Sequence, residues 1–220
     1  MAPQLPRHRN GIAPQGRSRF PDYDVLQQAH HWDEKTREVV LQRVNSVPPI
    51  RFFSDPEVRV LQPFVDVVMA QDEEPKIPVL EFIDEKLAKG SRDGYRYFVL
   101  PDDDELWRLV ARGLDVAGFA DASLEEQKQF VEDFSQARLH GEPWSQVNVA
   151  FAWEIVHRDI LTAFYSHPWA WNEIGFGGPA YPRGYARFGS RHLPQSEREP
   201  WEGREAVSWD PGEMREGLDE

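Results

Sequence analysis

The chain has 220 residues, no cysteine and a formal net charge of −13 at pH 7. The lack of cysteine excludes disulfides, thiolate-bound iron–sulfur clusters, thioether-linked haem and cysteine nucleophiles. The acidic charge argues against nucleic-acid binding, and no apolar run approaches the roughly 20 residues of a membrane-spanning helix, so we expect no direct membrane insertion.

The N-terminal residues 1–21 are rich in proline, arginine and glutamine. This composition predicts a disordered basic arm. No apolar stretch follows the arginines, so no signal peptide is visible and the sequence by itself indicates a cytoplasmic protein.

Apolar residues at helical spacing predict one or two amphipathic helices between residue 22 and Asn45. Two successive prolines then end the pattern. The capping box Ser54–Glu57, with a proline in its first turn, begins the next helix. Pro63 interrupts the apolar pattern of that helix, so we expect a kink or a junction between two helices there.

Four more helices follow, and no strand signal is clear. The first ends at Gly90, because glycine accepts the left-handed conformation that closes helices. The second starts with the acidic turn Asp102–Glu105, which complements the helix dipole. A second capping box, Ser123–Glu126, begins the third. The last long helix is expected to start at Gly141–Trp144 and to end at Tyr165.

These patterns predict an all-α protein, a small irregular bundle of five to six helices in one domain over residues 22–190. An acidic tail follows over residues 191–220. From Leu193 onward it has nine acids against three arginines, interrupted by Trp201 and Trp209. We expect a solvated, disordered end; the alternative is a strap whose two tryptophans anchor on this chain or another.

Residues 164–188 combine glycine and proline with two Trp, three Tyr and three Phe. Glycine and proline oppose a long helix or a central strand, so we expect an irregular segment whose rings are covered by its own domain or by a partner. We predict that it forms, with the last helix, a partner-binding face. The predicted contact residues are Trp169, Trp171, Phe176, Tyr181, Arg183 and Tyr185.

No motif in the sequence identifies a catalytic, cofactor-binding or metal site. Glu154 and His157 have the spacing found in di-iron carboxylate bundles, but no second Glu-x-x-His is present. Gly175–Gly178 resembles a phosphate cradle without the lysine and helix of a P-loop. Two alternatives stay open: an independent metal-binding helical enzyme that uses Glu154 and His157, and a free-standing chaperone or scaffold.

Several blocks resemble the gluconate 2-dehydrogenase subunit 3 family. Phe52–Asp72 is similar to the family's opening helix, and Ile77–Leu87 is similar to its second helix. His157–Pro168, Trp171–Pro179 and Pro182–Tyr185 resemble its closing signature, in which a Trp-x-x-Ile-Gly-Phe-x-Gly-Pro stretch follows a helix.

The resemblance extends over roughly residues 50–190 and implies an accessory subunit without catalysis of its own. Such subunits accompany a large FAD-binding dehydrogenase of the glucose–methanol–choline type, often together with a cytochrome c subunit. The large subunit oxidises a sugar or sugar acid with an acceptor other than NAD or oxygen, and the small one supports its maturation, stability or export. The resemblance therefore implies FAD in the partner and no cofactor in this chain. It also implies a periplasmic location if an exported partner carries the chain.

Overall fold

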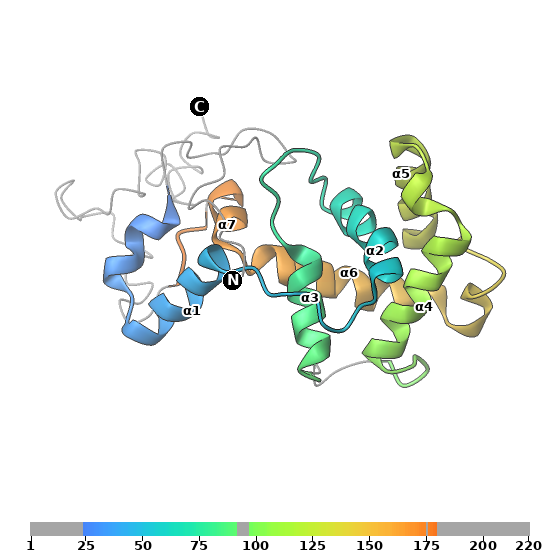
Figure 1. The fold of residues 1–220 in the computed structure, drawn as a ribbon, viewed down its shortest axis with the longest axis horizontal. Coiled ribbons are helices and arrows are strands. Elements are labelled where there is room, and N and C mark those ends of the chain that lie inside the picture. Colours follow the sequence, from blue (N-terminus) through green and yellow to red (C-terminus); the bar gives the residue numbers. More distant parts are fainter. Residues whose placement is uncertain (1–23, 92–96, 175, 180–220) are drawn as a thin grey trace, which may run out of the picture.

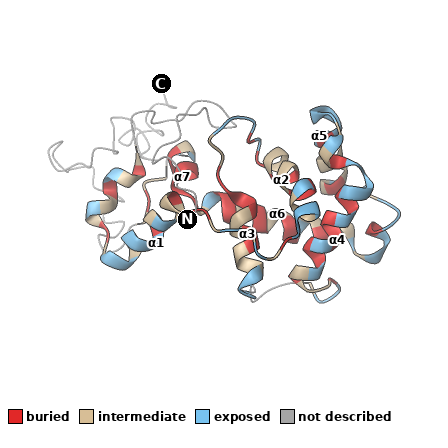
Figure 2. Cartoon of the chain, in the orientation of Figure 1, coloured by how far each residue is buried: buried red, intermediate tan, exposed pale blue. Residues whose placement is uncertain are grey.

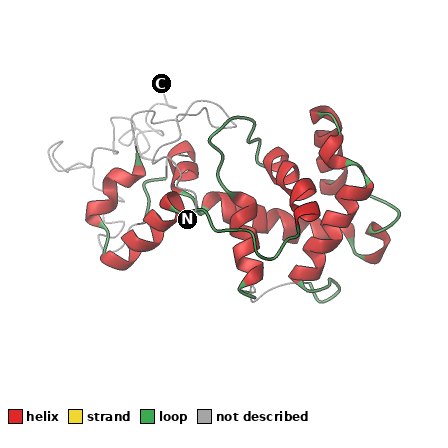
Figure 3. Cartoon of the chain, viewed as in Figure 1, coloured by secondary structure: helices red, strands yellow, loops and turns green. Residues whose placement is uncertain are grey.

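The computed structural model describes residues 24–91, 97–174 and 176–179, and all regular structure within them is helical (Figures 1 and 3). This confirms the all-α class. The predicted basic arm and the acidic tail lie outside the described residues. The helices are η1 (Val25–His31), α1 (Glu34–Asn45), α2 (Asp55–Val68), α3 (Val79–Ala88), α4 (Asp103–Val116), η2 (Phe119–Asp121), α5 (Leu124–Ser135), η3 (Trp144–Gln146), α6 (Val149–Tyr165) and α7 (Pro168–Ile174).

Helices α2 to α6 enclose the main hydrophobic core. α2 packs against α3, α4 and α5, and α6 packs against α3 and α5. Figure 2 shows the buried faces of these helices turned toward one another. The largest buried side chains of this core are aromatic, and they are Trp107, Trp169, Phe64, Phe119, Phe134 and Phe164.

Both predicted capping boxes and the predicted stop at Gly90 agree with the structure. The backbone N–H groups of Ser54 and Ser123 each donate to the carboxylate three residues ahead, at 2.8 Å, as capping boxes require. Gly90 and Gly118 have φ values of +61° and +65° just beyond α3 and α4. Because only glycine adopts this conformation without steric cost, these positions stop the two helices.

Three features of the helices differ from the sequence-based expectation. α2 continues through Pro63 as one helix, since buried residues hold it on both sides of the proline, so the junction between two helices, one of the two expected forms, is absent. The last long helix begins at Val149 rather than at Gly141–Trp144, where Trp144–Gln146 forms a separate short turn. Asn148 fixes the later start, because its side chain accepts a hydrogen bond from the N–H of Phe151 at 3.1 Å.

The third difference is α7, which lies inside the segment that was expected to be irregular. Proline is favoured in the first turn of a helix, so Pro168 starts this one at no cost. The glycines, at Gly175 and beyond, come only after the helix has ended. With α7 and the divided N-terminal helices, the described chain exceeds the five to six helices expected.

A buried carboxylate on α3 holds the chain that leads into α2. Asp84 is fully buried, and its two oxygens accept hydrogen bonds from three consecutive backbone N–H groups. These donors belong to Arg51, Phe52 and Phe53, at 2.7, 2.9 and 2.8 Å. Bonds from neutral donors to an ionised acceptor are among the stronger hydrogen bonds of proteins. Asp84 therefore fixes the approach of residues 51–53 to the core.

A second acid of α3 lowers stability at neutral pH. The Oε2 atom of Glu81 is buried and has no hydrogen-bond partner among the described residues. Burial raises the pKa of Glu81, and the nearby charges of Asp66 and Asp84 raise it further. A pKa that is higher in the folded chain stabilises the fold at acid pH, and this stabilisation disappears as pH rises through the folded pKa.

We therefore expect Glu81→Gln to raise the free energy of unfolding by about 1 kcal/mol at pH 7, because the amide fills the same site without a charge to desolvate. Below about pH 3 the carboxyl is protonated in both folded and unfolded chains, so the difference should vanish. Denaturation of both proteins across this pH range measures it. The matched control is Glu105→Gln, an exposed acid that is also the third residue of its helix. An equal gain in both variants would contradict the role of burial.

Candidate partner-binding site

The corner between α6 and α7 carries Trp169 and Trp171, two of the six predicted partner-binding residues. Only Ser166 and His167 separate the two helices. The indole Nε1 of Trp171 donates to the Tyr165 carbonyl at 2.6 Å. The Nδ1 atom of buried His167 accepts from the Trp169 N–H at 3.2 Å. These bonds set the direction in which α7 leaves α6.

The two tryptophans of α7 are buried against different parts of the chain. Trp169 is 1% exposed and belongs to the main core. Trp171 is 7% exposed and lies in a second, smaller cluster with Val25, Trp32 and Val40. Phe176 is half-buried and packs edge-to-face on Trp171, with ring centroids 5.5 Å apart. α7 thus joins the main core to the N-terminal helices.

The second cluster is closed by specific polar contacts as well as by apolar packing. The Asn172 side chain accepts from the Val25 N–H at 2.8 Å and donates to the Asp24 carboxylate at 3.3 Å. A Cβ atom at Gly178 would lie 2.6 Å from Val25, so only glycine lets the chain pass this close. η1 and α1 therefore cover one side of α7 (Figure 1).

The structure places the predicted contact residues in three different situations. Trp169 and Trp171 are covered by their own chain, which was one of the two possibilities left open by the sequence. Phe176 keeps part of its surface accessible. Tyr181, Arg183 and Tyr185 lie outside the described residues. Contact of these six residues with a partner stays a prediction.

Two apolar side chains that the sequence analysis did not single out are exposed at the same corner. Tyr165 at the end of α6 is 37% exposed, and Ile174 at the end of α7 is 55% exposed. The sequence predicts that Tyr165 ends the last long helix and that Ile174 lies in the irregular segment of residues 164–188. Their exposure depends on the angle between the two helices, which the sequence does not report.

A groove of about 550 Å³ lies beside this corner, between α1, the segment of residues 46–51, α3 and α6. Arg43 of α1 spans it and donates to the Ser166 carbonyl at 2.8 Å. Burial lowers the pKa of Arg43. On the α6 side, buried Asp159 forms an ion pair with Lys86 at 2.9 Å and accepts from the Trp107 indole at 3.1 Å. This pair connects α6 to α3 at the floor of the groove.

Glu154 and His157 make contacts that suit a structural role. The His157 ring stacks on Trp153, with centroids 4.9 Å apart and planes 12° apart, and burial lowers its pKa. The Glu154 carboxylate accepts a hydrogen bond from the Tyr97 hydroxyl. Nowhere in the described part of the chain do three or more His, Asp or Glu side chains gather as a metal site would require.

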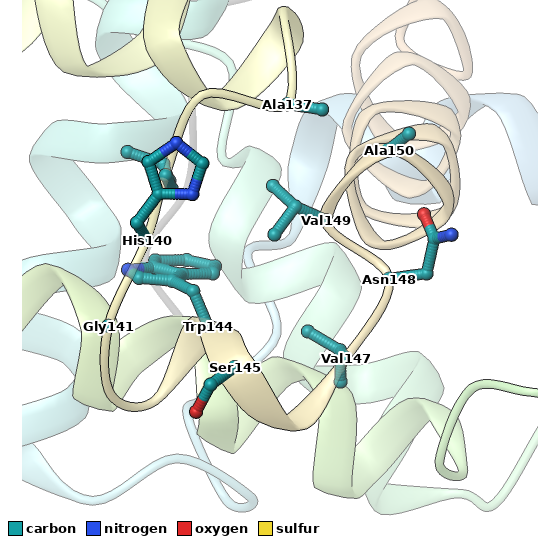
Figure 4. A pocket seen from close by; sticks show the side chains of 10 residues that line it. Ala137, His140, Gly141, Trp144, Ser145, Val147, Asn148, Val149 and Ala150 are labelled. Carbon is teal, nitrogen blue, oxygen red and sulfur yellow. The ribbon is translucent and has the colours of Figure 1, made fainter.

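A second hollow, of about 500 Å³, lies along the linker between α5 and α6 (Figure 4). Figure 4 shows His140 and Trp144 next to each other on this linker. The lining contains no carboxylate, and its side chains supply no second titratable group beside His140 for acid–base chemistry. It comprises Ala137, Leu139, His140, Gly141, Trp144, Ser145, Val147, Asn148, Val149 and Ala150.

Within residues 24–91, 97–174 and 176–179, every helix is too short or too polar to cross a lipid bilayer.

Comparison with known protein families gives a match over residues 55–178, more than half of the chain. The match begins at the first residue of α2 and includes α7, so it leaves out η1 and α1. Comparisons with curated proteins and with solved structures returned no match. The matching family is described as gluconate 2-dehydrogenase subunit 3. The chain therefore belongs to the gluconate 2-dehydrogenase subunit 3 family, whose members are accessory subunits of a dehydrogenase complex.

Proposed function

We propose that this chain is a non-catalytic small subunit of an FAD-dependent dehydrogenase of the glucose–methanol–choline type. In this proposal the large subunit holds FAD and oxidises a sugar or sugar acid, and the small subunit supports its maturation, stability or export. The observation that carries the proposal is the family match over residues 55–178, which includes α2 to α7 and every buried residue of the main core except Phe53. A cytochrome c subunit completes the proposed complex.

The proposed contact surface is the corner of α6 and α7 together with the residues that follow it. Tyr165, Ile174 and half-buried Phe176 present apolar area there. Aromatic residues and arginine are the usual anchors of protein interfaces, and Tyr181, Arg183 and Tyr185 continue the chain directly from this corner. In this proposal buried Trp169 and Trp171 contribute to binding indirectly, because they fix the direction of α7.

Co-expression tests the proposal. The tagged chain is produced together with a large FAD-binding dehydrogenase from the same organism, and the purified material is assayed for flavin absorbance and for gluconate-dependent dye reduction. We expect a stable complex, and a large subunit produced alone should give less soluble or less flavin-loaded protein. Turnover by the isolated chain would contradict the proposal, and so would full activity and yield of the large subunit without it.

The same preparation separates the two alternatives. Stoichiometric iron, zinc or manganese in the isolated chain would favour a metal enzyme built on Glu154 and His157. Recovery of many unrelated proteins, in place of one dominant flavoprotein, would favour a general chaperone or scaffold.

A further inference from the structure

The groove between α1, α3 and α6 is more positive than the rest of this acidic chain. Its lining contains four basic residues, Arg43, Arg51, Lys86 and Lys89, and two acidic ones, Glu85 and Asp159. The whole chain has a net charge of −13. A local excess of positive charge on an acidic protein attracts anionic groups that the remaining surface repels.

Two of the four cations are not neutralised within the described chain. Lys86 pairs with Asp159 and Lys89 pairs with Glu85, each within 2.9 Å. Arg43 donates to a neutral carbonyl instead, although its guanidinium is partly desolvated. The exposed Arg51 side chain has no carboxylate partner among the described residues. Desolvated guanidinium groups are well suited to bidentate binding of carboxylates.

The groove also has an apolar wall. Val39 of α1 is exposed, and Phe82 and Ile83 of α3 contribute to the lining. A matching ligand therefore combines carboxylates with a flat apolar group. Residues 193–220 of the same chain have this composition, with nine acids against three arginines. Each tryptophan in that stretch has acids close by, as in Glu199-Pro-Trp201-Glu202 and Trp209-Asp210.

The path of the chain allows this segment to reach the groove. Gly178 lies against Val25 and Trp32, which belong to the same N-terminal unit as the α1 wall of the groove. From residue 179 to Leu193 an extended chain can span roughly 45 Å. Loop closure of this length has a small entropic cost, and tethering gives the segment an effective concentration in the millimolar range.

We propose that the groove between α1, α3 and α6 is the docking site of this chain's own acidic segment, residues 193–220. Its carboxylates bind Arg43 and Arg51, and one of its two indoles covers the apolar wall and stacks on a guanidinium. This contact goes beyond the proposed role as an accessory subunit and does not depend on it.

Because the chain contains no cysteine, pairs of introduced cysteines report proximity in the full-length protein. Ser46→Cys, in the groove lining, is combined with Ser208→Cys in the acidic segment. The matched control combines Ser208→Cys with Leu124→Cys, an exposed position at the start of α5, at the other end of the molecule (Figure 1). A short bismaleimide then links each pair, and the yield of monomeric cross-linked product is measured.

We expect the groove pair to cross-link about fivefold better than the control pair at low salt, and to lose this advantage at about 1 M salt, where the Debye length is about 3 Å. Arg51→Glu with Lys89→Glu should abolish the preference. The same charge change at exposed Arg112 and Lys128, at the other end of the molecule, should leave it intact. Circular dichroism confirms that each variant remains helical.

Equal cross-linking of the two pairs would overturn the proposal, and so would a preference that survives the charge reversal in the groove. Cross-linked dimers in place of monomeric product would mean that the groove binds the acidic segment of a second copy. This result would also contradict docking within one chain.

Discussion

Replacing Asp84 with alanine should lower the free energy of unfolding by about 4 kcal/mol, since this change removes the buried acceptor of three backbone N–H groups. The bond from the Phe53 N–H is buried, so water cannot replace the carboxylate there without opening the packing around Phe53. Chemical denaturation followed by circular dichroism measures the loss.

Two variants distinguish the lost hydrogen bonds from a general effect of changing α3. Asp84→Asn keeps the shape and one oxygen acceptor, so it should retain part of the stability that the alanine variant loses. Glu85→Ala removes the next acid along the helix, which pairs with Lys89 at the surface, and it should cost less than about 1 kcal/mol. If Asp84→Ala costs no more than Glu85→Ala, the three bonds do not stabilise the fold as described.

Asp84 also illustrates what the sequence could not predict about the fold. Helix boundaries follow from local chemistry, so the capping boxes at Ser54 and Ser123 and the stop at Gly90 were correctly predicted. An acid within an amphipathic helix is normally solvated. The burial of Asp84 and Asp159 depends on which donors the tertiary structure brings to them, and no local pattern contains that information.

As with the fold, only part of the candidate site could be predicted from the sequence. The combination of aromatic residues with glycine marks residues 164–188 as unusual, and the family resemblance agrees with the family match over residues 55–178. The sequence did not reveal that η1 and α1 cover α7, because the residues in contact are about 150 positions apart, as the Val25–Asn172 bond shows. It also gave no sign of the cationic groove, whose lining comes from four separate parts of the chain.

The second large effect that we expect concerns the packing of η1 and α1 on α7. Trp171→Ala should release η1 and α1 from α7 while the main core stays folded. Truncating a buried aromatic side chain costs about 3–5 kcal/mol, and the second cluster has few other buried residues to offset this loss. Local stabilities span a range from zero up to that of the whole protein, and a small peripheral cluster lies at the low end.

Hydrogen exchange measured by mass spectrometry tests this expectation. Exchange of amides in residues 25–45 should accelerate about 100-fold or more, since each 1.4 kcal/mol corresponds to a factor of ten. Amides in α2 and α4 should keep their protection. In the co-expression experiment the same variant should also recover less of the large subunit, because α7 then lacks the support that sets its direction.

The matched control is Tyr165→Ala, which removes an exposed ring at the same corner but none from the second cluster. It should leave residues 25–45 protected, and it should weaken the complex only through the lost contact area. Faster exchange throughout α2 to α6 in the Trp171 variant would mean that α7 and the main core unfold as one unit. The Trp171 variant could also show fast exchange in residues 25–45 and still recover as much of the large subunit as the unchanged chain. Binding would then not require α7 to be held in place by η1 and α1.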